Sequence, residues 1–174
     1  MKNYKNNLPL LKENNVYSED MEHDAWGVGI IASTEGKKSR KVVEYGIEAL
    51  KAVWHRGAVD ADGKTGDGAG IHVEIPKDFF IEKIEVTGHT HDNSEICVGM
   101  IFLPRNDYAA QESCKTIVES ELTKNDFSIY GWRQVPVNPK VLGEKAFQTM
   151  PEIIQVLFKP YNPELTNKDL ERKI

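Results

Sequence analysis

The apolar run at residues 96–103 limits the folds open to this chain, because hardly any polar side chain interrupts it. A short run of this kind, bounded by polar segments, is typical of a β-strand buried on both of its faces. Such a strand belongs to a sheet that other elements cover on either side, so we expect a layered fold.

Two amphipathic helices are predicted beside this strand. One follows Ser39, which can cap its first turn, and extends to about residue 55; the other follows Asp107 and extends to about residue 122. Apolar side chains recur at helical spacing in both segments. These are Val43, Ile47, Leu50 and Trp54 in the first helix, and Ala110, Cys114, Ile117, Val118 and Leu122 in the second.

Four further strands are predicted at residues 27–32, 70–75, 127–130 and 153–158. The polar segment 83–94, which contains Gly88 and Asn93, is predicted to be a surface loop. The resulting order is strand, helix, strand, strand, helix, strand, strand. This order is compatible with an α+β sandwich, although the pattern alone leaves several α+β folds open.

The composition fits one globular domain or part of one. Of the 174 residues, 40% are hydrophobic and 28% are charged. The net charge of −5 argues against a nucleic-acid partner or an anionic membrane surface, because both need clustered Lys and Arg. No apolar run approaches the roughly 20 residues that cross a bilayer, and the amino-terminal segment lacks the apolar core of a secretory signal. Cys97 and Cys114 show no Cys-x-x-Cys spacing, which favours reduced, buried thiols in a cytoplasmic protein.

Six short motifs follow one another along the chain. Near the amino terminus these are His23-Asp24-Ala25-Trp26-Gly27-Val28-Gly29, then His55-Arg56-Gly57-Ala58, then Thr65-Gly66-Asp67-Gly68-Ala69-Gly70. A second block contains Tyr130-Gly131-Trp132-Arg133-Gln134-Val135-Pro136-Val137, followed by Val141-Leu142-Gly143-Glu144 and Pro151-Glu152-Ile153-Ile154-Gln155. Any one glycine-rich fragment is weak evidence, but their common order is specific.

In this order the motifs resemble the glutaminase domain of the glutamate synthase large chain, a class II glutamine amidotransferase and N-terminal-nucleophile hydrolase. The resemblance implies the four-layer αββα sandwich of those hydrolases. It also implies a leader-like segment at residues 1–25 and the amino-terminal part of the glutaminase domain at residues 26–174. Thr166 and Asp169 resemble the start of a helix that Ile174 cuts short, so we expect a sandwich incomplete at its carboxyl end.

Trp26 stands where the family has its nucleophile. The family sequence Asp-Ala-Cys-Gly-Val-Gly is cut before the cysteine, whose thiolate then attacks glutamine while its free α-amine serves as the base. An indole N–H only donates hydrogen bonds and is not nucleophilic. We therefore expect neither cleavage before residue 26 nor glutamine hydrolysis by this chain. The structural alternative is that Trp26 is a buried strand aromatic in an unrelated site.

The resemblance also assigns the remaining site residues. Arg56 matches the arginine that holds the α-carboxylate of glutamine, a role that suits its two-pronged donor; alternatively, it is an exposed helix-end arginine. Gly27, Gly66, Asp67 and Gly68 are expected to support the pocket. The family's oxyanion-hole Asn-Gly pair has no match in residues 1–174.

No metal site or cofactor is predicted for this chain. His89, His91 and Asp92 supply possible ligands in one polar loop, but no distant residue completes a tetrahedral site. FMN and the iron–sulfur cluster are expected only in other domains of the full-length family. The expected partners are L-glutamine and the remaining glutamate synthase domains or subunits.

Two alternatives stay open from the sequence. The chain could be a non-catalytic module that binds glutamine or docks on an intact synthase. The Trp26 codon, which differs from a cysteine codon at one base, could also be an error or a recent mutation.

Overall fold

The computed structural model describes residues 27–53, 59–66 and 68–162. These residues fall into two compact units. The first contains the described residues up to 53 together with 68–71, and the second contains 59–66 and 72–162.

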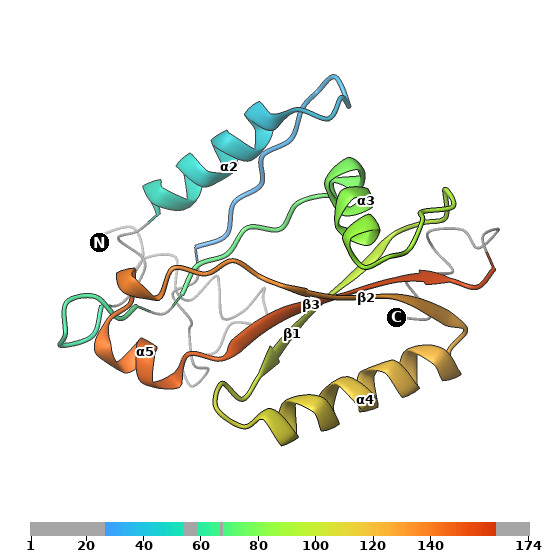
Figure 1. Ribbon diagram of the computed structural model, residues 1–174. Coiled ribbons are helices and arrows are strands. Elements are labelled where there is room, and N and C mark those ends of the chain that lie inside the picture. Colours follow the sequence, from blue (N-terminus) through green and yellow to red (C-terminus); the bar gives the residue numbers. More distant parts are fainter. Residues whose placement is uncertain (1–26, 54–58, 67, 163–174) are drawn as a thin grey trace, which may run out of the picture. The chain divides into compact units, whose positions relative to one another are not determined.

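A three-stranded antiparallel sheet organises the second unit (Figure 1). The strands are β1 (Cys97–Leu103), β2 (Phe127–Gln134) and β3 (Glu152–Pro160), in the spatial order β1-β3-β2. All three coincide with predicted strands, which confirms those predictions, although β2 and β3 are longer than expected. The central strand β3 also has the most buried side chains, among them Val156 and Leu157.

Helix α4 (Tyr108–Lys124) packs on one face of this sheet. The Asp107 carboxylate accepts a hydrogen bond from the backbone nitrogen of Ala110 at 2.9 Å, so the predicted cap is confirmed. Val118 and Leu122 pack against the core of this face, which contains Cys97, Phe127, Val156 and Phe158. The prediction that Ile117 belongs to the apolar stripe is wrong, because its side chain is 62% exposed. It directly precedes Val118, and consecutive helical residues point about 100° apart.

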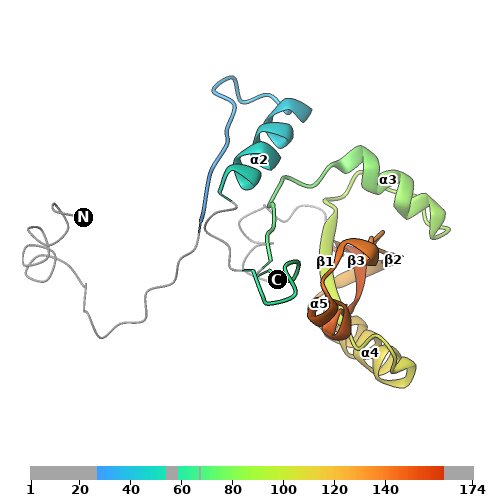
Figure 2. The same cartoon turned by 90° about the vertical axis from the view of Figure 1, so that its left-hand side faces the viewer.

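Helix α3 (Lys77–Val86) covers the opposite face, as Figures 1 and 2 show. Phe80 and Ile84, one helical turn apart, pack with Ile96, Tyr130 and Leu157. The prediction of a loop at 83–94 is therefore wrong for 83–86, which form the last turn of this helix. The remainder is a loop, with Gly88 and Asn93 in the left-handed region at φ 83° and 64°.

Helix α2 (Arg40–Ala52) belongs to the first unit. The Ser39 hydroxyl accepts a hydrogen bond from Lys41 N at 3.2 Å, which confirms both the predicted helix and its cap. None of the helix's described residues is buried.

The strands predicted at 27–32 and 70–75 are not formed. Both segments lack secondary structure, and the side chains of Val28 and Ile30 are 90% and 91% exposed. Alternating apolar residues favour a strand only when a neighbouring strand satisfies the backbone hydrogen bonds, and no such neighbour lies among the described residues.

The described residues therefore confirm a fold of mixed helix and strand content. They do not show the expected four-layer αββα sandwich, since their one sheet has a helix on each face. Two short elements connect β2 to β3, namely the 3₁₀ turn η2 (Pro139–Val141) and helix α5 (Glu144–Thr149). Within the described parts of the chain, no helix is long and apolar enough to cross a membrane.

Candidate functional site

The structure describes only half of the predicted site residues. Trp26, Arg56 and Asp67 lie outside the described residues, so their predicted roles stay predictions. Gly27, Gly66 and Gly68 are described, and all three are exposed.

Of two described motif glycines, Gly68 has a backbone conformation that favours glycine and Gly29 does not. Gly68 has φ 91°, and a Cβ added to it would meet no atom within 4 Å, so its backbone conformation rather than crowding favours glycine. Gly29, which follows Gly27 in the first motif, likewise has open space for an added Cβ but no left-handed φ.

Residues 59–66 form a tight, internally bonded loop that ends at Gly66. Val59 and Gly66 form an isolated antiparallel bridge, and Asp60 N donates a hydrogen bond to Thr65 O at 2.7 Å. Inside the loop, Asp62 Oδ1 accepts from the backbone nitrogens of Lys64 and Thr65 at 2.9 and 2.7 Å. Its Oδ2 accepts from the Thr65 hydroxyl at 2.6 Å. One carboxylate thus fixes both the backbone and the side chain of Thr65.

These hydrogen bonds also favour the ionised form of the Asp62 carboxyl group. The Thr65 hydroxyl contributes most to holding the pKa of Asp62 well below its usual range, followed by the backbone nitrogens of Thr65 and Lys64. Asp62 is therefore ionised at neutral pH. A carboxylate of such low basicity is a poor general base, so the Thr65–Asp62 pair does not resemble an activated nucleophile.

The same loop contacts the start of helix α5, more than 75 residues further along the chain. Lys145 Nζ forms an ion pair with Asp60 Oδ2 at 2.7 Å, and Ala146 N donates to Thr65 Oγ1 at 3.4 Å. A Cβ on the buried Gly143 would overlap Asp62 Oδ2 and Thr65 Oγ1 and lie 2.6 Å from Thr65 N. We call the five residues Asp60, Asp62, Thr65, Gly143 and Lys145 the clasp.

Sequence reasoning missed the clasp, although it joins two of the motifs. The sequence Asp62-Gly63-Lys64-Thr65 carries the signal of a local turn, since Asp side chains readily bind the backbone two or three residues on. Nothing local to Gly143 or Lys145 indicates their partners about 80 residues earlier. Only the fold brings them together.

The two remaining motifs are neighbouring strands. In the register of β2 and β3, Arg133 lies opposite Gln155 and Gln134 opposite Ile154. Arg133 Nη1 donates to Gln155 Oε1 at 2.6 Å, and the Gln134 side chain donates to Glu152 Oε1. The motif residues therefore bind one another across the sheet.

A bulge separates Ile129 from Gly131 in β2. Gly131 has φ 145°, and a Cβ there would lie 3.0 Å from Thr87 Cγ2. Both the backbone conformation and the close approach of Thr87 require glycine.

The polar loop that carries His91 and Asp92 is bonded to the sheet and to its own backbone. Asp92 forms an ion pair with Lys159. It also accepts a hydrogen bond from the Ser94 hydroxyl at 2.6 Å and one from Tyr130 Oη at 3.4 Å. His91 Nε2 lies 2.9 Å from Ser94 O. These groups fasten the loop to the sheet, and no cluster of three or more candidate ligands occurs among the described residues.

Neighbouring charges, hydrogen bonds and burial shift the pKa values of Asp92 and Tyr130. The Lys159 ammonium contributes most to holding the pKa of Asp92 well below its usual range, with the Ser94 hydroxyl next. Burial, together with the nearby Asp92 carboxylate, raises the pKa of Tyr130 to about 12. Tyr130 therefore stays neutral and donates to Asp92 at physiological pH.

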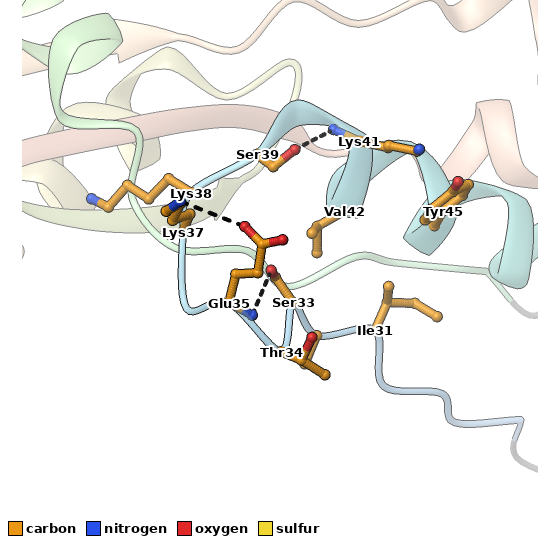
Figure 3. Close-up of a pocket in the computed structure, with 11 residues that line it drawn as sticks. Ile31, Ser33, Thr34, Glu35, Lys37, Lys38, Ser39, Lys41, Val42 and Tyr45 are labelled. Carbon is orange, nitrogen blue, oxygen red and sulfur yellow. Dashed lines mark hydrogen bonds and ion pairs between the residues drawn. The ribbon is translucent and has the colours of Figure 1, made fainter.

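A shallow hollow of about 540 Å³ lies in the first unit, between the segment before α2 and its first turns (Figure 3). Its charged side chains have partners, with Lys37 Nζ 3.6 Å from Glu35 Oε2 and Lys41 Nζ 5.4 Å from the ring centre of Tyr45. Of the predicted site residues that the structure describes, Gly27, Gly66 and Gly68, none lines it.

Cys97 is not a candidate nucleophile. Its side chain is buried in the core beneath α4, and burial, with a smaller effect of Glu95, raises its pKa to about 11. A thiol in this state is almost entirely protonated at neutral pH and cannot act as a thiolate. Cys97 and Cys114 are both free thiols, as predicted, but Cys114 is only partly buried.

Comparison with known proteins gives a consistent result. Residues 26–174 match the family of class-II glutamine amidotransferases. The chain is 55% identical over 154 residues to the glutamate synthase [NADPH] large chain of Azospirillum brasilense, covering 88% of this chain and 10% of that protein. It is 38% identical over 167 residues to ferredoxin-dependent glutamate synthase 2, chloroplastic, of Arabidopsis thaliana, covering 94% of this chain and 10% of that protein.

The yeast glutamate synthase [NADH] of Saccharomyces cerevisiae is 36% identical over 154 residues, covering 86% of this chain and 7% of that protein. The chain thus spans about one tenth of the length of the curated relatives that it matches. The family match begins at Trp26, includes the motifs from there on, and covers every described element. This chain belongs to the class-II glutamine amidotransferases.

Proposed function

We propose that residues 26–174 are part of the glutaminase domain of a glutamate synthase, and that the chain with Trp26 does not hydrolyse glutamine. The observation that carries this proposal is the match that begins at residue 26, in the sequence Asp24-Ala25-Trp26-Gly27-Val28-Gly29. In an intact domain the reaction would convert L-glutamine to glutamate and ammonia.

The chemistry of residue 26 accounts for the loss of activity. Amide hydrolysis by this family needs a thiolate to attack the side-chain carbonyl of glutamine and a free α-amine to transfer protons. Indole supplies neither group, because its nitrogen only donates a hydrogen bond. Removal of a nucleophile typically lowers the rate by several orders of magnitude. Cys97 does not replace it, since its thiol is buried and protonated.

Arg56, the residue proposed to bind the α-carboxylate of glutamine, is present in this chain. A guanidinium can hold the α-carboxylate of glutamine through two parallel hydrogen bonds, which lysine cannot reproduce. Retention of Arg56 also favours a second candidate function, namely glutamine binding without hydrolysis. Trp26 would then limit the space beside the amide group of the ligand.

We also propose that the fold is completed as an αββα sandwich. The exposed, alternating apolar residues at 27–32 and 70–75 suit strands whose partners are other strands of the domain. The domain would then associate with the FMN- and iron–sulfur-binding parts of a synthase in the cytoplasm, while this segment itself binds no cofactor.

An ammonia-release assay tests the catalytic proposal. The protein with Trp26 is expected to release no ammonia from glutamine above background. A chimera that joins residues 1–174 to the remainder of the Azospirillum brasilense chain provides matched forms, with Trp26 or with Trp26→Cys. Only the Trp26→Cys form is expected to release ammonia. Ammonia release by the purified protein with Trp26 would refute the proposal.

Calorimetry separates the two candidate functions. L-glutamine is titrated into the protein and into Arg56→Lys and Arg56→Ala, with D-glutamine as the ligand control. Millimolar or tighter binding of the L-isomer, weakened in both variants, would support glutamine binding without hydrolysis. Absence of heat with every form would leave the family assignment but remove the binding function.

A further inference from the structure

The clasp connects two motifs that are far apart in sequence. Lys145 and Asp60, which form its ion pair, are separated by 85 residues, and Ala146 and Thr65 by 81. Figure 1 shows the loop of residues 59–66 beside the start of α5. The loop is therefore fixed to the connection between β2 and β3, which is anchored by the sheet at both of its ends.

The clasp acts at the first residues of the glycine-rich motif. Thr65 opens this motif, and its backbone nitrogen, hydroxyl and carbonyl are all engaged, by Asp62 and by Asp60 N. Gly66, which directly follows, pairs with Val59. Any displacement of Thr65 would therefore shift Gly66.

Gly143 makes this close fit possible. Its φ of −72° and ψ of 164° are available to any residue, so backbone conformation does not require glycine here. The requirement comes from the loop, because a Cβ would overlap the side chains of Asp62 and Thr65 and press on the Thr65 backbone. A larger residue would have to push the loop away from α5.

We propose that Gly143 and Lys145 are positioning residues that set the location of Thr65 and Gly66, and thereby the affinity for glutamine. The second part rests on the proposed function and on the role that the family resemblance implies for Gly66, support of the glutamine pocket. Gly143 sets how closely the loop approaches, and Lys145 holds it there through Asp60. Neither residue needs to touch the ligand.

Hydrogen exchange measures the clasp directly. Exchange of the backbone amides of residues 59–66 is followed by mass spectrometry in Gly143→Ala, Lys145→Ala and Lys145→Arg. Gly143→Ala is expected to accelerate exchange about tenfold or more, because overpacking displaces the loop. Lys145→Ala is expected to accelerate it up to about fivefold, since the Lys145 side chain is largely exposed, and Lys145→Arg should restore protection.

Gly29→Ala is the matched control, because a Cβ at Gly29 meets no atom within 4 Å. It should leave exchange of residues 59–66 unchanged. Unchanged exchange in Gly143→Ala would overturn the inference. The melting temperature of each variant is measured in parallel, since a positioning role predicts local loosening in Lys145→Ala without a shift of global unfolding.

Glutamine titration of the same variants tests the functional part. The expected result is weaker binding in Gly143→Ala and Lys145→Ala, normal binding in Lys145→Arg and Gly29→Ala, and an unchanged melting temperature in Lys145→Ala. Loosened exchange with unchanged affinity would overturn the positioning role while the proposed function stands. If the unmodified protein binds no glutamine, the proposed binding function and the effect on affinity both fail, whereas hydrogen exchange still decides whether Gly143 and Lys145 position Thr65 and Gly66.

Discussion

The indole nitrogen of Trp132 donates a hydrogen bond to Glu119 Oε1 at 2.6 Å, and thereby connects strand β2 to helix α4. Both side chains are half-buried, and Trp132 also packs against the core beneath the helix. This tryptophan lies in the family motif that begins at Tyr130. Its contacts indicate a structural role for that part of the motif.

Loss of this hydrogen bond should lower the stability of the second unit. Glu119→Ala is expected to reduce the free energy of unfolding by about 1–2 kcal/mol, because it leaves a half-buried indole N–H without its charged acceptor. Urea denaturation followed by circular dichroism measures the change.

Glu121→Ala is the matched control on the same helix. Glu121 pairs with Lys124 at 2.6 Å, but both side chains are more than half exposed, so its removal should cost at most about 0.5 kcal/mol. Equal effects of the two substitutions would contradict the structural role of Trp132 and Glu119.

The core of the second unit was largely predictable from the sequence. The run at 96–103 and the cap at Asp107 are local signals, and both elements form where they were expected. Helix α3 was missed because the polar segment 83–94, with Gly88 and Asn93, suggested a loop. Its existence depends on burial of Phe80 and Ile84 against Leu157, a contact more than 70 residues away in sequence.

A second prediction compares a buried residue of the sheet with an exposed residue of α4. Leu157→Ala removes a fully buried side chain from the central strand and is expected to lower the free energy of unfolding by about 3 kcal/mol. Ile117→Ala, at a site that the sequence pattern wrongly placed in the core, should change stability by less than about 0.5 kcal/mol. Urea denaturation compares the two variants, and a large loss in Ile117→Ala would show that its side chain is buried.

The two cysteines should differ in reactivity. At a pH of about 8, iodoacetamide is expected to label Cys114 and leave Cys97 unmodified, since Cys97 is buried and its pKa is raised to about 11. Mass spectrometry of tryptic peptides distinguishes the sites.

Unfolding in urea provides the control for reactivity, because both thiols should then react. Labelling of Cys97 in the folded protein at the rate found in urea would contradict its burial.

The candidate site was less predictable than the core. The motifs indicated Gly66 and Gly68 as parts of one loop, but Gly143 and Lys145, which contact residues 59–66, lie about 80 residues further along the chain. A turn at Asp62 can be predicted from the following Gly63 and Thr65. Its contact with Gly143 cannot, because that distance depends on how the β2–β3 connection returns to the loop.

Acid should release the Asp62 turn over a defined pH range. Hydrogen bonds, above all that of Thr65 Oγ1, hold the pKa of Asp62 below the ordinary value of 3.8. A lowered pKa in the folded state means that the stabilisation is complete above the unfolded value and is lost as pH falls through the folded value. The loop should therefore be unchanged between about pH 7 and 5 and should open only below about pH 4.

The backbone amide of Thr65, which donates to Asp62 Oδ1, reports this transition in NMR spectra. Its chemical shift is expected to titrate with a midpoint below 3.8, because the ionised carboxylate is the form that accepts its hydrogen bond. Asp62→Asn retains an acceptor oxygen but cannot ionise, so the Thr65 amide should lose this titration. A midpoint at or above 3.8 in the unmodified protein would mean that the Asp62 carboxylate does not hold the turn. Interactions other than those of Asp62 would then fix the loop that Gly143 and Lys145 contact.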